Sequence, residues 1–327
     1  MTSLTVRQLL YFDALAQTRH FGRAAEVAGV TQPALSSQIA ELEARLGCRL
    51  FERGGRKVEL TAEAEALQPR ISAILAQIRE VEDMATRGRN RMQGRFRLGM
   101  IPTVAPYLLP RLLPELRVRF PELQLELREA VTGILAAEAS AGRIDAFVAA
   151  LPLDQQGLVI ETLFEDRFML AVPKADADFV NPPVQPESPA LERLMLLEEG
   201  HCLRDQALKV CGDVRPATLA SFGATSLTTL LQMVGHGLGV TLIPEMAAEP
   251  SRSVEGLKIV PFAEPMPSRT IALAWRRGGH REAECRDLAG LIRDVAVTQL
   301  RRSRQPPSPL SHCASDATPQ GTPATAG

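Results

Sequence analysis

The sequence has no long hydrophobic run, no strong charge of either sign, few aromatic residues and only five cysteines. A membrane-spanning helix needs roughly 18–20 apolar residues in succession, which no segment provides, and the N-terminus lacks the apolar stretch of a signal peptide. The net charge of -1 leaves no whole-chain attraction for nucleic acid, so any such site must be local. The cysteine spacing fits neither a secreted disulfide framework nor a zinc motif. We therefore expect a cytoplasmic protein without a membrane segment, metal or cofactor, in which thiols rest reduced.

The length and the order of sequence patterns indicate several folded units. A chain of 327 residues with 45% hydrophobic and 23% charged residues is expected to form two or three parts. Short amphipathic helices are predicted up to about residue 46, and a long helix follows from about residue 60. Strand-like and helix-like segments then alternate, which favours mainly parallel sheets with helical connections. We expect an all-α N-terminal domain over 1–61, a linker helix over 62–93, an α/β domain of two lobes over 94–301, and a disordered tail rich in Pro, Ser and Thr over 302–327.

The long helix carries one continuous apolar stripe. Its members step alternately by three and four residues and are Leu67, Ile71, Ile74, Ile78, Val81 and Ala85. An average step of about 3.5 residues is typical of a coiled-coil seam, which would make this helix a dimer interface. An amphipathic helix packed on its own chain would show a similar stripe, so both interpretations stay open.

The segment from Phe21 to Ala40 has the features of a helix-turn-helix. The small residues Ala24 and Ala25 allow two helices to cross closely, and Gly29 allows the turn between them. The candidate base-contacting residues at the start of the second helix are Thr31, Gln32, Pro33, Ser36, Ser37 and Gln38. Beyond this helix, candidates for phosphate contacts surround a glycine pair and are Arg53, Arg56 and Lys57. The alternative is a helical hairpin used for protein contact.

Two cysteines, Cys202 and Cys211, flank eight residues of helix-like sequence. Cys202 follows His201 and stands two residues before Arg204, and both cations favour the reactive thiolate. In a helix the two Cα atoms would lie roughly 13 Å apart, at about 1.5 Å per residue. A disulfide requires roughly 4.4–6.8 Å, so pairing would require the backbone to rearrange. The two thiols are thus arranged like a redox switch, although a lone cysteine is more commonly a small buried apolar residue.

Several motifs together resemble one family of DNA-binding proteins. Residues 21–42, followed by Leu46-Gly47, Leu50 to Arg53 and Leu60-Thr61, resemble the DNA-binding domain of LysR-type transcriptional regulators. The order of parts is similar to that family from about Thr5 to Leu300. One departure is at Ala62-Glu63-Ala64, where the family usually has alanine then glycine after the threonine. That change should favour the helix and cost little function.

The resemblance implies a winged helix-turn-helix dimer joined through linker helices and often doubled to a tetramer. Such a protein binds double-stranded operator DNA and works with RNA polymerase. The α/β domain is expected to resemble periplasmic binding proteins, with an effector site between its two lobes.

Four segments narrow the resemblance to the peroxide-sensing members of that family. They are Gly99 to Pro110, Leu197 to Ala207, Ala224 to Leu230 and Gly239 to Pro244. The resemblance implies that hydrogen peroxide oxidises Cys202 to sulfenic acid, that Cys211 resolves it to a disulfide, and that a thiol reductant such as glutaredoxin resets the switch. The peroxide pocket that it implies contains Thr103, Thr132, His201, Asp205 and Arg269, to which Arg204 is added as a cation near the thiol.

We therefore expect a regulator that is not an enzyme and that mainly activates the oxidative-stress response. The alternative is a LysR-type regulator that responds to a small molecule bound between the lobes, with incidental cysteines. A thiol peroxidase is disfavoured because an enzyme needs no DNA reader, and a solute-binding protein because no export signal is present. Cys48 and Cys285 are expected to be structural, and Cys313 lies in the predicted tail outside the switch.

Overall fold

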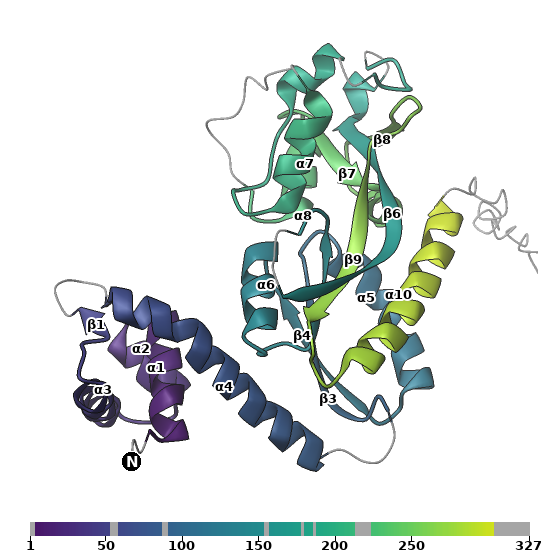
Figure 1. The fold of residues 1–327 in the computed structure, drawn as a ribbon. Helices are drawn as coiled ribbons and strands as arrows, with labels where there is room; N and C mark the ends of the chain where they lie inside the picture. The colour runs from purple at the N-terminus through teal and green to yellow at the C-terminus, as the bar shows by residue number, and fades with distance from the viewer. Residues whose placement is uncertain are drawn as a thin grey trace, which may run out of the picture.

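The computed structural model describes residues 4–52, 58–86, 91–153, 157–177, 180–185, 188–212 and 224–303 (Figure 1). A small domain at the N-terminus is joined by one long helix, α4 (Ala62–Thr86), to a larger α/β domain of two lobes. This arrangement confirms the predicted fold class, with a winged helix-turn-helix, a linker helix and a two-lobed regulatory domain. None of the described helices has both the length and the apolar character needed to cross a membrane.

The N-terminal domain consists of α1 (Val6–Thr18), α2 (Phe21–Val27), α3 (Gln32–Leu46) and the short antiparallel strands β1 (Phe51–Glu52) and β2 (Glu59–Leu60). A capping box starts α1, since Thr5 Oγ1 accepts the Gln8 N–H at 3.3 Å and Gln8 Oε1 accepts the Thr5 N–H at 3.2 Å. Ala24 and Ala25 are buried on α2, as close helix crossing requires. Gly29 makes the turn at a φ of 65°, a left-handed conformation that favours glycine.

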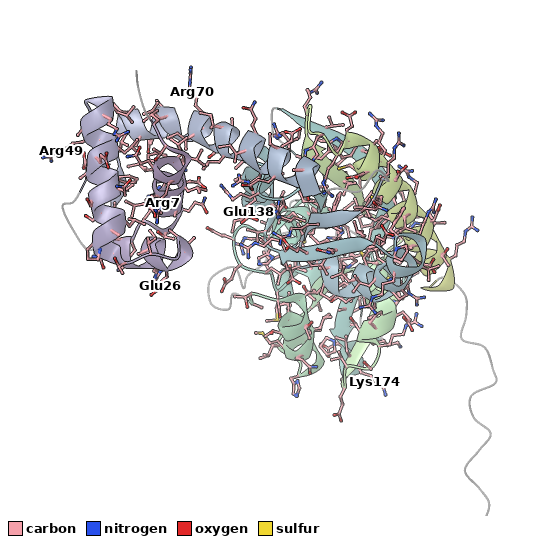
Figure 2. The ribbon with its side chains drawn as sticks, turned by 90° about the horizontal axis from the view of Figure 1, so that it is seen from below. Arg7, Glu26, Arg49, Arg70, Glu138 and Lys174 are labelled. Atoms are coloured by element: carbon pink, nitrogen blue, oxygen red, sulfur yellow. The ribbon has the colours of Figure 1, made fainter. Side chains whose placement is uncertain are left out.

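The apolar stripe predicted on α4 is divided between two environments. Ile71 is buried in the core of the N-terminal domain, and Leu67 and Ile78 are partly buried against that core. Ile74 and Val81, by contrast, are 44% and 67% exposed. Arg70, on the same helix, points into open space (Figure 2). Part of the stripe therefore packs on its own chain, and the rest is open to a partner.

The α/β domain has two lobes, each with its own apolar core. The first lobe contains β3 (Gly94–Met100), α5 (Ala105–Arg119), β4 (Leu123–Glu129), α6 (Thr132–Ser140), β5 (Ala146–Ala150) and α10 (Glu282–Ser303). The second lobe contains the 3-10 helices η1 (Lys174–Asp176) and η2 (Pro189–Arg193), with α7 (Cys202–Cys211), α8 (Leu227–Gly235), β7 (Thr241–Pro244), α9 (Glu245–Ser251) and β8 (Leu257–Pro261). The long strand β6 (Leu158–Pro173) runs from one lobe into the other, and β9 (Ser268–Arg276) lies beside its first-lobe half (Figure 1).

The strand pairing differs from the mainly parallel sheets that the sequence pattern favoured. β3 pairs in parallel with β4 and β5, but β9 pairs antiparallel with both β5 and β6, and β6 pairs antiparallel with β7 and β8. The prediction of mainly parallel sheets was therefore wrong. Alternating strands and helices indicate helical connections, but they do not reveal that a late strand, β9, inserts between β5 and β6.

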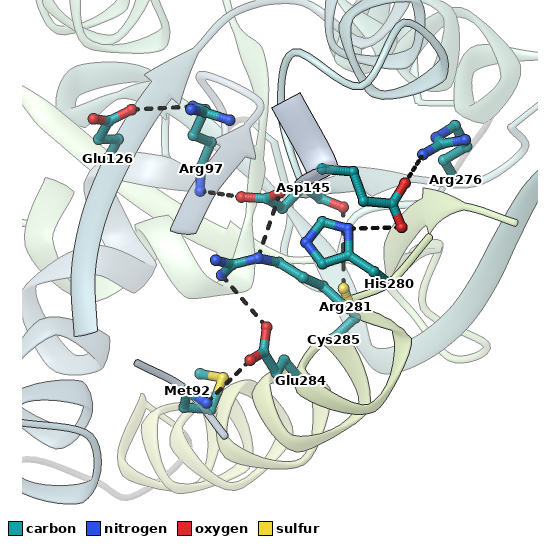
Figure 3. Close-up of polar contacts among 10 residues, drawn as sticks. Met92, Arg97, Glu126, Asp145, Arg276, His280, Arg281, Glu284 and Cys285 are labelled. Atoms are coloured by element: carbon teal, nitrogen blue, oxygen red, sulfur yellow. Dashed lines mark hydrogen bonds and ion pairs between the residues drawn. The ribbon is translucent and has the colours of Figure 1, made fainter. Parts of the chain in front are cut away.

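Polar contacts fix α4 to the first lobe (Figure 3). Glu80 accepts a hydrogen bond from Arg276 at 3.4 Å and lies 3.2 Å from Nδ1 of His280. Arg79, the residue before Glu80 on α4, donates to the carbonyl oxygen of Ala141 at 2.9 Å. The arm that carries the helix-turn-helix is thus attached to the end of β9 and to the loop after α6.

A second polar cluster lies beside this joint and fixes the start of α10 (Figure 3). The buried Arg281 lies 3.8 Å from Asp145 and 3.4 Å from Glu284. Glu284 in turn accepts the backbone N–H of Met92 at 3.2 Å. Met92, just before β3, is therefore held against the start of α10.

Gly142 packs closely against Ala76 in this joint. A Cβ atom on Gly142 would lie 2.5 Å from the Cβ of Ala76, which is closer than two carbon atoms can pack. Gly142 also has a φ of 64°, in the left-handed region. Both constraints favour glycine at this position.

We predict that Gly142→Ala destabilises the contact between α4 and the first lobe. The added methyl group collides with Ala76, and the left-handed backbone adds roughly 1–2 kcal/mol of strain. Gly237→Ala is the matched control, because Gly237 has a φ of 84° and nothing within 4 Å of an added Cβ. Chemical unfolding should show a loss at least about 1 kcal/mol larger for Gly142→Ala, and Ala76→Gly in the same chain should recover part of it. Equal losses at positions 142 and 237 would contradict the close contact.

Candidate functional site

The candidate DNA-reading surface is the exposed face of α3. Leu35, Ile39 and Leu42 form the buried stripe that holds this helix on the N-terminal core, and the burial of each is worth about 1.5–3 kcal/mol. The opposite side of α3 therefore faces solvent. Of the predicted base-contacting residues, Thr31, Gln32, Pro33 and Ser37 are exposed, and Ser36 and Gln38 are partly buried.

Individual polar groups on this surface differ in how available they are to DNA. Thr31 is the N-cap residue of α3 but makes no side-chain cap hydrogen bond, so its hydroxyl is available to a ligand. Gln38 donates to Glu41 at 3.0 Å and would have to exchange this bond for one to a base. Arg49 is exposed and projects away from the body of the molecule (Figure 2), an additional cation that the sequence prediction did not include. The predicted phosphate-contacting residues Arg53, Arg56 and Lys57 lie outside the described residues.

Helix α7 begins at Cys202 and ends at Cys211, so the two thiols stand at opposite ends of one helix. Cys202 is partly buried and packs against the core of the first lobe, whereas Cys211 is 3% exposed within the core of the second lobe. Both are free thiols. At about 1.5 Å per residue, their Cα atoms are roughly 13 Å apart, and a disulfide requires roughly 4.4–6.8 Å. At least part of α7 must unwind before the two sulfurs can pair.

The residues around Cys202 make contacts that differ from those expected. His201 is the N-cap of α7, and partial burial lowers the pKa of its imidazole more than nearby Glu198 raises it. The ring is therefore mostly neutral at neutral pH and is not the cation beside the thiol that the sequence predicts. Arg204 turns back and donates to the carbonyl oxygen of Leu197 at 3.0 Å, which holds the loop before α7. Asp205 is exposed.

Thr103 and Arg269, two residues of the predicted pocket, meet at the junction of the lobes. Arg269 Nη1 donates to Thr103 Oγ1 at 2.9 Å, and Nη2 donates to the Thr103 carbonyl oxygen at 3.1 Å. On its other edge, Arg269 donates from Nε and Nη2 to Oδ2 of Asp166, at 3.1 and 2.9 Å. All three residues are buried, so these charge-assisted hydrogen bonds offset the loss of water around the charges.

Two buried polar atoms in this region have no hydrogen-bond partner within the part of the chain that the structure describes. They are Oγ1 of Thr132, at the start of α6, and Oε1 of Gln206, on α7. The residues just before the two helices approach each other, because a Cβ on Gly200 would lie 3.9 Å from Cγ2 of Val131. A buried polar group without a partner costs about 1–3 kcal/mol, so a small hydrogen-bonding ligand would stabilise this region.

The sequence prediction missed Gln206 and Asp166. Gln206 carried a signal, since its four-residue spacing from Cys202 places both side chains on the same face of α7. Asp166 carried none, because it meets Arg269 only through the pairing of β6 with β9. In the described ranges, no group of three or more His, Cys, Asp or Glu side chains is arranged to hold a metal ion.

A winged helix-turn-helix joined to a two-lobed domain is the architecture of a DNA-binding regulator with its own regulatory domain. Two sequence profiles agree with this class of protein. The profile of the bacterial regulatory helix-turn-helix protein, lysR family, matches residues 6–65, and that of the LysR substrate binding domain matches residues 89–297. The chain belongs to the LysR family of transcriptional regulators.

Individual relatives indicate which members of this family the chain is similar to. The chain is 39% identical over 291 residues to the DNA-binding transcriptional dual regulator OxyR of Escherichia coli (strain K12), covering 89% of this chain and 95% of the relative. It is 35% identical to a hydrogen peroxide-inducible genes activator of Haemophilus influenzae, covering 91% and 99%. A full-length OxyR mutant from Pseudomonas aeruginosa superimposes with a TM-score of 0.69 at 34% identity, covering 89% of this chain and 95% of that one. A hydrogen peroxide-bound OxyR mutant from Corynebacterium glutamicum gives 0.63 at 32% identity, covering 91% and 94%.

We predict that iodoacetamide separates the described cysteines into two groups. Cys48 and Cys202 are partly exposed, whereas Cys211 and Cys285 are buried, and burial raises the pKa of both buried thiols. A raised pKa and poor access both slow alkylation, so Cys211 and Cys285 in the native reduced protein should react at least about tenfold more slowly than Cys202. Mass spectrometry of tryptic peptides measures each rate, and unfolding in guanidinium should remove the difference. Equal rates for Cys202 and Cys211 in the native protein would mean that α7 is already open.

Proposed function

We propose that this chain is a transcriptional regulator that senses hydrogen peroxide through Cys202 and Cys211. The observation that carries the proposal is the placement of the two thiols at opposite ends of α7, one at the lobe junction and one inside the second lobe. A peroxide signal agrees with the names of the E. coli and H. influenzae relatives. The protein would act mainly as an activator of the oxidative-stress response. It would not be an enzyme, because its oxidation would serve to change DNA binding and not to turn over peroxide.

The proposed chemistry has two steps. The Cys202 thiolate sulfur attacks one peroxide oxygen, the O–O bond breaks, and a sulfenic acid forms while the second oxygen leaves as hydroxide and takes up a proton to give water. The Cys211 sulfur then attacks the sulfenic sulfur and displaces its oxygen as water, which leaves a disulfide. A dithiol reductant such as glutaredoxin would return two electrons and restore both thiols.

Each member of the proposed peroxide pocket has a distinct part. Thr103, Thr132 and Arg269 would hydrogen-bond the peroxide, and neutral His201 would order the water or peroxide beside the sulfur. Arg204 would hold the loop before α7 through its bond to Leu197, and Asp205 would lie at the exposed rim. The unpartnered Oγ1 of Thr132 supports this assignment, because a bound peroxide would satisfy it.

The disulfide would refold α7 and change the surface of the second lobe. Leu203, Ala207 and Cys211 form the buried face of this helix. Unwinding α7 withdraws these side chains from the core and reshapes the lobe junction. The reduced and oxidised arrangements would thus be two states of one element, each favouring a different spacing of the attached DNA-binding domains.

The functional unit is proposed to be a homodimer that doubles to a homotetramer. The exposed Ile74 and Val81 on α4 would be covered by the same helix of a partner subunit. Paired helix-turn-helix units would then read two half-sites of double-stranded operator DNA and act there with RNA polymerase. A regulator of transcription works beside the chromosome, so the proposed location is the cytoplasm.

We predict that one equivalent of hydrogen peroxide produces a Cys202–Cys211 disulfide that mass spectrometry maps directly. Cys202→Ser should abolish the product, because it removes the attacking sulfur. Cys211→Ser should stop the reaction at a sulfenic acid that dimedone traps on Cys202. Cys48→Ser, at a partly exposed cysteine in the N-terminal domain, is the control and should leave the product unchanged. Oxidation elsewhere with Cys202 still reduced would rule the proposal out.

The same variant distinguishes the small-molecule alternative. If the cysteines are incidental, Cys202→Ser keeps an effector-dependent change in DNA binding. If they form the sensor, the variant binds DNA but no longer changes its footprint when peroxide is added.

We predict that Gln32→Ala and Ser36→Ala weaken binding to a duplex selected from a random library by the unmodified protein. Each lost base contact should cost about 1–3 kcal/mol, and the sequence preference should relax at the affected position. Gln124→Ala, at an exposed position on β4, is the matched control and should bind normally. Gel-shift titration at fixed salt measures the affinities. Unchanged affinity and sequence preference in both variants would place the reading surface elsewhere.

A further inference from the structure

Asp166 lies directly opposite Arg269 in the antiparallel ladder of β6 and β9, near the point where β6 passes into the second lobe. The side chains of both residues are 0% exposed. Oδ2 of Asp166 accepts from Nε and Nη2 of Arg269, and Oδ1 accepts the backbone N–H of Met246 at 3.1 Å. Burial raises the pKa of this carboxyl, and the Arg269 guanidinium opposes that rise. Because all three partners are N–H donors, the contacts fit the ionised carboxylate.

The carboxylate determines how the guanidinium of Arg269 is oriented. A guanidinium is planar, so fixing the edge formed by Nε and Nη2 also fixes the direction of Nη1. Nη1 then reaches Oγ1 of Thr103 at 2.9 Å. The ring of Phe168, with its centroid 5.9 Å from the guanidinium carbon, covers one face of the group. A Thr103 hydroxyl that accepts from Arg269 keeps its own proton for donation, which suits a peroxide oxygen.

We propose that Asp166 is a positioning residue of the peroxide pocket, which holds Arg269 and through it Thr103 in the orientation that promotes cleavage of the O–O bond. This inference rests on the proposed function of Arg269 and Thr103. Negative charge develops on the departing peroxide oxygen, and donors that are already aligned stabilise it without reorganising. Asp166 touches neither the peroxide nor Cys202 in this role.

If Asp166 has this role, its substitution should slow the reaction of Cys202 with peroxide but not its alkylation. Attack on peroxide requires the aligned donors, whereas alkylation by iodoacetamide requires only the accessible thiolate. In Asp166→Asn, the rate of Cys202 sulfenic acid formation by hydrogen peroxide should fall by at least about tenfold, because misplaced donors slow such steps strongly. The rate of alkylation by iodoacetamide and the later closure of the disulfide should stay within about twofold. Stopped-flow oxidation with dimedone trapping and alkylation followed by mass spectrometry measure the three rates on the full chain.

Two further variants make the test decisive. Asp176→Asn makes the same substitution in an exposed ion pair with Arg193 and should change none of the three rates. Asp166→Glu keeps the buried charge balance if Asp166→Asn fails to fold, and its longer side chain should still displace Arg269 and slow the peroxide step alone. A full peroxide rate in either Asp166 variant would overturn the inference. An equal fall in oxidation and alkylation would also overturn it, since that outcome assigns Asp166 a general structural role. If the unmodified protein is not oxidised at Cys202, the proposed function itself has failed; if it is oxidised normally, only the role of Asp166 is at stake.

Discussion

The buried ion pair between Asp166 and Arg269 is the contact on which the geometry of the lobe junction depends. It joins β6 to β9, reaches the first lobe through Thr103, and reaches the start of α9 through the N–H of Met246. Removing one member of such a pair leaves an uncompensated buried charge, at a cost of about 3–5 kcal/mol. The total stability of a domain is only about 5–15 kcal/mol, so the loss of either partner would remove a large part of it. The pair therefore fixes the arrangement of β6, β9 and Thr103 at the lobe junction.

Rearranging helix α7 requires much less free energy than breaking this ion pair. Its buried face consists of Leu203, Ala207 and Cys211, of which only Leu203 is a large apolar side chain. Exposing a leucine costs about 1.5–3 kcal/mol, and the two smaller side chains add less. The energy of a new disulfide can offset losses of this size, but it would hardly offset a broken buried ion pair as well. The contrast agrees with the proposed thiol switch, in which α7 would rearrange while the Asp166–Arg269 pair stays in place.

The parts that could be predicted from the sequence are those whose signals are local. The helix-turn-helix follows from Ala24, Ala25 and Gly29, and the placement of both thiols on one helix follows from the residues between them. The antiparallel course of β6 and β9 could not be predicted, because it depends on a strand that returns from far along the chain. Asp166 was missed for the same reason. Gly142 gave no signal either, since its need for glycine comes from contact with Ala76 as well as from its own turn.

Strand β9 connects the two polar sites of the molecule. Arg269 lies near its first end in the lobe junction, and Arg276 lies at its last residue, where it contacts Glu80 of α4. β9 is bonded on both sides, to β5 and β6, so the strand cannot easily absorb a displacement by bending. The ion pairs at the two ends of β9 differ in strength. The Asp166–Arg269 pair is fully buried, whereas the Arg276–Glu80 pair is partly exposed, and exposed pairs contribute only about 0–1 kcal/mol. The joint with α4, which carries the DNA-binding domain, is therefore the weaker of the two ends of β9.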